Sequence, residues 1–240
     1  MIKQISQFIV AIVILAIAQP TQAQWSFNPN LAPSLLWPVV NNPCPNGNCG
    51  GSKKPKQDSS AVAKLSSSKL VFKPSTTVRQ TNLKRFIENI RQTNPAGVAQ
   101  VKQLFESTDV VNQVGQKMVA VGLKPNNLAD AYAVYWTNAW LGARGRNENL
   151  PKSQMIAVRN QVAEVLLKAP QLASATDTQK QEIAETLLVQ SLLIYLATEG
   201  SKSDPALSAQ VQKVIAQGAK GFGLDLYQMT LTSQGFQANK

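Results

Sequence analysis

The segment that most constrains this fold is LADAYAVYWTNAWLGARG, residues 128–145, which holds half of the chain's tyrosines and tryptophans. At 100° per residue its aromatic side chains form one stripe of a helix, and the opposite side is also largely apolar. A helix that is apolar nearly all round is a buried one. The sequence therefore predicts a central helix over about 128–144, which other helices must cover.

On both sides of this segment, apolar residues recur at helical spacing, and capping residues lie between these stretches. Thr108 is expected to cap the third helix. Thr176 and Gln179 form a capping-box pair ahead of the longest helix, about 177–199. No segment shows strand alternation flanked by hairpin turns. The pattern predicts an all-α fold, a single helical-bundle domain of about seven helices over residues 75–240.

The N-terminus has the pattern of a cleaved secretory signal. Lys3 precedes the apolar run FIVAIVILAIA, Pro20 breaks the helix, and small residues follow as far as Ala23. The apolar run is shorter than the roughly 20 residues that span a bilayer, which favours a signal peptide over a membrane anchor. Residues 1–23 are therefore predicted to be removed. The mature protein is expected to have no transmembrane span and to be periplasmic or extracellular.

Residues 24–74 are predicted to form a flexible, disordered arm, because they are rich in Pro, Gly, Asn, Ser and Lys and have no sustained period. Trp25 and Trp37 are exceptions, and either pack on the helical body or form a short motif for a partner. Cys44 and Cys49 bracket a turn sequence, PNGN. In an exported protein these two cysteines are expected to form a disulfide, and two thiolates alone are a weak signal for a metal.

The net charge of +11 is partly a property of the arm, where lysines are frequent between residues 53 and 73. A basic arm can hold a protein against an anionic surface without a specific site. The helical body is only weakly basic, and export also argues against a nucleic-acid partner. We therefore expect no nucleic acid among the partners.

The central helix contains the candidate binding residues Asp130, Tyr132, Tyr135 and Asn138. The tyrosines and the neighbouring tryptophans are explained most simply as core residues, although their polar atoms leave a ligand platform open. Asp130 has a structural explanation: with Asn127 as N-cap it lies in the first turn, where a carboxylate complements the helix dipole. Asn138 has no such explanation on so apolar a helix.

The residue types present limit the chemistry. The chain has no histidine and both cysteines lie in the arm, which removes Ser-His-Asp and Cys-His catalysis and histidine-based zinc sites. No cofactor motif or metal site is expected. Carboxylate chemistry remains open, with Glu185, Glu164, Glu88 and Asp130 as its candidates, but the chain shows no acidic pair at a recognisable spacing.

Three stretches, TVRQTNLKRFIENIRQTNPAG, LADAYAVYWTNAW and LTSQGF, resemble a family of exported bacterial proteins defined only as a domain of unknown function. The resemblance covers roughly residues 72–237. It implies export and a single helical domain, and it implies no activity or site residues.

Two functions of different classes follow. The first is a non-catalytic exported helical module that binds an envelope protein or an anionic cell-wall surface. The alternative is a carboxylate-dependent glycosidase that acts on cell-wall glycans.

Overall fold

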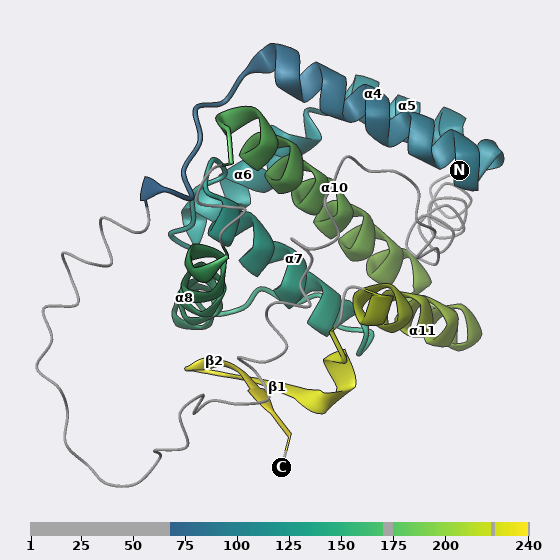
Figure 1. Ribbon diagram of the computed structural model, residues 1–240. Coiled ribbons are helices and arrows are strands. Elements are labelled where there is room, and N and C mark those ends of the chain that lie inside the picture. Colours follow the sequence, from purple (N-terminus) through teal and green to yellow (C-terminus); the bar gives the residue numbers. More distant parts are fainter. Residues whose placement is uncertain (1–67, 170–174, 222–223, 240) are drawn as a thin grey trace, which may run out of the picture.

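The computed structural model describes residues 68–169, 175–221 and 224–239 (Figure 1). The predicted signal peptide (1–23), the arm as far as residue 67, and the predicted Cys44–Cys49 disulfide lie outside the described residues.

Seven α-helices make up most of the described part, which confirms the all-α prediction. They are α4 (Thr76–Thr93), α5 (Val98–Ser107), α6 (Val110–Ala120), α7 (Leu128–Gly142), α8 (Lys152–Lys168), α10 (Asp177–Ser201) and α11 (Pro205–Gly221). A 3₁₀ turn, η3 (Pro95–Gly97), precedes α5, and a second one, η4 (Leu226–Gln228), follows α11. None of the described helices is both long enough and apolar enough to span a membrane.

The predicted central helix is α7. All of its residues except Asn138 are buried, and α10 packs along it (Figure 1). Helices α6, α8 and α11 surround this pair, α4 packs against α10, and α5 packs against α4. Phe86 of α4 contacts Phe105 of α5, with the two ring centroids 5.8 Å apart, and this contact connects the two outer helices. The apolar character of α7 on all sides is thus matched by neighbours on all sides.

The helix starts follow the predicted capping chemistry with one correction. Thr176 and Gln179 form the predicted capping box at the start of α10, and the Asn127 side chain accepts backbone N–H groups at the start of α7. The third helix is capped by Asp109, not by Thr108 as predicted. The Asp109 carboxylate accepts the N–H of Asn112 at 3.0 Å, and a carboxylate also complements the positive end of the helix.

The packed body begins before residue 75, which corrects the predicted end of the arm. Leu70 and Phe72 are buried in the core. The carbonyl of Leu70 accepts the N–H of Leu128, and the N–H of Phe72 donates to the carbonyl of Asn126. Lys180 of α10 donates to the carbonyl of Val71 at 2.8 Å. Hydrogen bonds to residues far along the chain hold this segment, and such contacts leave no local period in the sequence.

The C-terminus forms a β-hairpin that the sequence analysis missed. Strands β1 (Met229–Thr232) and β2 (Gly235–Ala238) pair antiparallel, with Leu231 opposite Phe236. Gln161 of α8 accepts the N–H of Phe236 and donates to its carbonyl, both at 2.8 Å. Gly235 has a φ of +98°, and a Cβ there would meet the Gln161 side chain, so this turn requires glycine.

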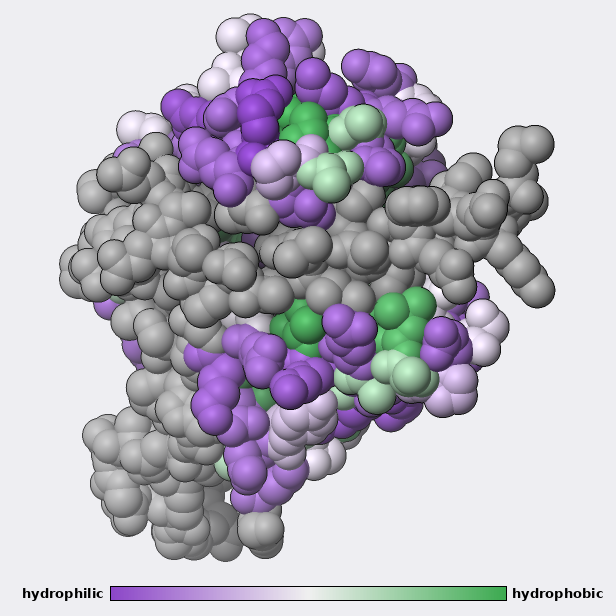
Figure 2. Space-filling view, turned by 90° about the vertical axis from the view of Figure 1, so that its right-hand side faces the viewer, coloured by the Kyte–Doolittle hydropathy of each residue, from purple (hydrophilic) through white to green (hydrophobic). Residues whose placement is uncertain are grey.

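The face of the described helices shown in Figure 2 is mainly hydrophilic, with small apolar areas. On the side shown in Figure 2, polar side chains predominate both over α4 and α5 above and over α11 below. Among the described residues, the large apolar or aromatic side chains that are well exposed are Val119 and Tyr227. These two residues are isolated from each other in the sequence, and scattered exposed side chains of this kind are normal for a folded protein.

Candidate functional site

The aromatic residues of α7 belong to the core, as their simplest interpretation predicted. Tyr132, Tyr135, Trp136 and Trp140 are all buried. Phe236 of the hairpin packs against both tryptophans, with ring centroids 6.1 and 6.3 Å away. Burial raises the pKa of both tyrosines above the ordinary value. The candidate residues Tyr132 and Tyr135 therefore lie inside the bundle and do not line the pocket described below.

Asp130 is also buried, close to a second charged side chain. Its Oδ2 accepts the N–H of Lys124 at 3.0 Å, while its Oδ1 lies 3.8 Å from Nε of Arg159. Asp130 Oδ1 and Arg159 Nε have no hydrogen-bond partner among the described residues. Burial raises the pKa of Asp130, against the lowering effects of the Lys124 N–H and the Arg159 charge. Besides its place in the first turn of α7, Asp130 therefore holds the Lys124 backbone and lies beside the Arg159 charge.

The raised pKa of Asp130 gives a prediction on pH. A carboxyl whose pKa in the folded state exceeds its ordinary value of 3.8 favours folding below that value, and this contribution is lost as pH rises through the folded pKa. Asp130→Asn removes the titration and keeps an oxygen for the Lys124 N–H. Relative to the wild type, its free energy of unfolding is therefore expected to rise between pH 4 and 8. Urea denaturation across this range measures the gain, and parallel curves for the two proteins would contradict it.

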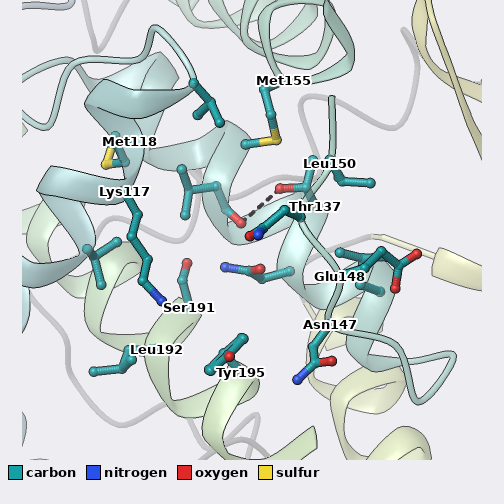
Figure 3. A pocket seen from close by; sticks show the side chains of 16 residues that line it. Lys117, Met118, Thr137, Asn147, Glu148, Leu150, Met155, Ser191, Leu192 and Tyr195 are labelled. Atoms are coloured by element: carbon teal, nitrogen blue, oxygen red, sulfur yellow. Dashed lines mark hydrogen bonds between the residues drawn. The ribbon is translucent and has the colours of Figure 1, made fainter. Parts of the chain in front are cut away.

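The described part of the chain has a pocket of about 130 Å³, partly open to solvent, between α6, α7 and α10 (Figure 3). The loop after α7 and the start of α8 complete it. Its lining comprises Val114, Lys117 and Met118 of α6, Val121 directly after α6, Val134, Thr137, Asn138 and Leu141 of α7, Asn147, Glu148, Asn149 and Leu150 of the loop, Met155 of α8, and Ser191, Leu192 and Tyr195 of α10.

Asn138 is the candidate residue that the structure places in this pocket. It is half-buried, and its amide makes no hydrogen bond to the described residues. The Tyr195 hydroxyl, on the facing helix, also makes no such hydrogen bond. Both groups lie at a pocket that is partly open to solvent, where water can bond to them. Both are therefore available to a ligand.

Two further hydroxyls line the pocket with their donors already used. Thr137 donates to the carbonyl of Ala133 and lies 3.1 Å from that of Val134, the bond that Figure 3 marks. Ser191 donates to the carbonyl of Leu187 at 2.7 Å. Both residues are buried, with 2% and 0% of their surface exposed, so their hydroxyls belong to the packing behind the pocket.

One cation at the pocket is not paired with a carboxylate. Lys117 has no ion-pair partner among the described residues, and its Nζ lies 5.1 Å from the ring centroid of Tyr195. Glu148, by contrast, accepts a hydrogen bond from Arg146, which lowers the pKa of the Glu148 carboxyl. In Figure 3 the Glu148 carboxylate points away from Lys117 and Ser191. The pocket thus has a positive charge at its edge.

The other carboxylates considered for catalysis lie elsewhere. Glu185 is buried and accepts hydrogen bonds from Arg79, Asn82 and Gln181. Glu164 and Glu88 are exposed and each pairs with a basic residue of its own helix. No two of the four candidates, Asp130 included, share the pocket. Across the described residues there is also no group of three or more acidic, histidine or cysteine residues that could hold a metal ion.

Lys117, Ser191 and Tyr195 are pocket residues that sequence reasoning missed. Each lies on an ordinary amphipathic or buried helix and carries no local signal. The only available signal was Asn138, a polar residue without a capping or surface role on the most apolar helix. These residues line one pocket only because the fold makes α6, α7 and α10 neighbours.

Comparison with other proteins gives a family but no function. No curated protein and no solved structure matches the chain. The family model extends further than the stretches that suggested a resemblance, because it also includes most of the predicted signal peptide and the arm. The model described as "Family of unknown function (DUF6683)" matches residues 3–239, and the chain therefore belongs to that family.

Proposed function

We propose that this protein is an exported, non-catalytic module that binds an envelope partner, a protein or an anionic wall component, through the pocket between α6, α7 and α10. The observation that carries the proposal is the unpaired amide of Asn138, the one residue of α7 that is not buried. The amide is half-buried in a pocket that is partly open to solvent, so water can bond to it in the free protein. A partner that bonds to this amide replaces that water.

The charge state of the pocket carboxylate supports binding over catalysis. A glycosidase needs a general acid with a raised pKa and a second carboxylate about 5–10 Å away. The one carboxylate that lines the pocket is Glu148, and Arg146 lowers its pKa. The carboxylates first considered are either buried in hydrogen-bond networks or exposed on outer helix faces. These arrangements support the binding function over the glycosidase alternative.

Export rests on the N-terminal sequence. The basic residue, the apolar run and the small residues before Gln24 are in the order that signal peptidase substrates have. Exported modules meet their partners in the envelope, where both wall polymers and proteins are available.

Site-specific photo-crosslinking in intact cells tests the proposal. A photo-reactive amino acid at Asn149, an exposed residue of the pocket edge, is expected to form a crosslinked species in the envelope fraction. The same amino acid at Glu164, exposed on the outer face of α8, is the matched control and should give none. Mass spectrometry of the crosslinked chain should find Gln24, or its cyclised form, at the N-terminus.

Asn138→Leu in the Asn149-labelled chain provides the second control. The substitution breaks no hydrogen bond to the described residues, so the fold should be retained while the crosslink is lost. Equal crosslinks from positions 149 and 164, or a crosslink unaffected by Asn138→Leu, would overturn the proposed pocket. An uncleaved chain in the cytosolic fraction would overturn export.

A further inference from the structure

We propose that the pocket binds an apolar amino-acid residue through its free α-carboxylate, either as a free N-substituted amino acid or as the C-terminus of a peptide. This inference rests on the binding function proposed above and specifies the chemistry of the ligand. It is carried by one cation, two polar groups without a hydrogen-bond partner among the described residues, and the apolar side chains that line one small volume.

The lining groups come from the faces of three helices, at helical spacing. Residues 114, 117 and 118 share one face of α6, residues 134, 137, 138 and 141 one face of α7, and residues 191, 192 and 195 one face of α10. Rigid helices therefore hold the side chains in place, as a selective site requires.

The size of the pocket limits the ligand. A volume of about 130 Å³ is close to that of an apolar cavity of roughly 150 Å³ that holds a benzene molecule. Met118, Met155, Val134 and Leu141 supply an apolar floor, and methionine side chains adapt to different shapes. The pocket can therefore take a side chain such as leucine, methionine or phenylalanine, and it is too small for a lipid chain or a row of sugar units.

The charge at the edge selects an anionic head group. Lys117 has no ion pair within the described part of the chain, and its exposed side chain places the ammonium over the Tyr195 ring. The Tyr195 hydroxyl and the Asn138 amide are donors without a described partner. A carboxylate can accept from all three. The pocket carboxylate Glu148 does not compete for Lys117, because it is paired with Arg146.

Isothermal titration of the mature protein with matched probes tests the inference. N-acetyl-leucine is expected to bind about tenfold more tightly than N-acetyl-leucinamide, which has the same shape without the charge. Lys117→Gln should abolish this discrimination. Lys213→Gln, which removes an exposed charge from α11 outside the pocket, should leave it unchanged. A peptide, acetyl-Ala-Ala-Leu, separates the two sources: tighter binding indicates a peptide C-terminus, and weaker binding a free amino acid.

Several outcomes would overturn the carboxylate inference. These are equal binding of the acid and the amide, equal behaviour of Lys117→Gln and Lys213→Gln, and the absence of binding by all three probes. Asn138→Leu is a second pocket variant that should weaken the binding of both the acid and the amide. An unchanged far-UV circular dichroism spectrum shows that this variant is folded. Failure of these titrations leaves the crosslinking result intact, so the ligand class and the binding function are tested separately.

Discussion

Trp136→Ala is expected to lower the free energy of unfolding by about 3–5 kcal/mol. Trp136 is 2% exposed, lies in the middle of α7, and packs against Phe236 of the hairpin. Removing the indole leaves a cavity between helices whose backbones cannot close it. Because ordinary domains are stable by roughly 5–15 kcal/mol, the loss is a large fraction of the total. Urea denaturation followed by circular dichroism measures it.

Two matched substitutions identify the cause of this loss. Val119→Ala removes apolar atoms from a side chain that is 63% exposed, and it should change the stability by at most about 0.5 kcal/mol. Trp136→Phe should lie between the wild type and Trp136→Ala, because it keeps most of the volume and removes an indole N–H that has no hydrogen-bond partner among the described residues. An unchanged melting temperature for Trp136→Ala would show that this ring is not core.

Glu185→Ala is expected to lower the free energy of unfolding by a similar amount, about 3–5 kcal/mol, for an electrostatic reason. Glu185 is 3% exposed and accepts hydrogen bonds from Arg79 at 2.9 Å, Asn82 at 2.8 Å and Gln181 at 2.9 Å. Gln181 also bonds to the N–H and carbonyl of Ser75, which caps α4. Removing the carboxylate leaves the buried Asn82 amide without its acceptor, takes one partner each from Arg79 and Gln181, and loosens the attachment of α4 to α10.

Glu182→Ala is the control on the same helix. Its carboxylate pairs with Arg85 of α4 at 2.8 Å, but the Arg85 side chain is largely exposed. Solvent screens such a pair, so the loss should be at most about 1 kcal/mol. Denaturation of both variants at neutral pH compares the two carboxylates. Equal losses would show that burial of Glu185 and its hydrogen bonds does not dominate.

Most of the helical architecture could be predicted from the sequence, because its signals are local. Periodic apolar residues, capping side chains and the uniformly apolar α7 each depend on neighbours within a turn or two. The error at the third helix is of the same kind: Thr108 and Asp109 are adjacent capping residues, and the position of the first helical turn decides between them.

The candidate site was predictable only in part. Asn138 was identified because a polar residue conflicts with the apolar pattern of its own helix. Tyr132 and Tyr135 lie in the core, since the same stripe that made them conspicuous also turns them towards the other helices. Lys117 and Tyr195 gave no signal, because their importance depends on the contact between α6 and α10.

The sequence by itself determined the helices, their order and the buried position of α7, since side-chain periodicity acts within one element. Only the tertiary structure decided three things: the attachment of residues 68–74, the C-terminal hairpin and the pocket. The hairpin shows the physical reason. Its strands have four residues each, too few to be stable alone, and the backbone of Phe236 is held by Gln161, which lies 75 residues earlier. Such long-range hydrogen bonds exist only once the helices are packed.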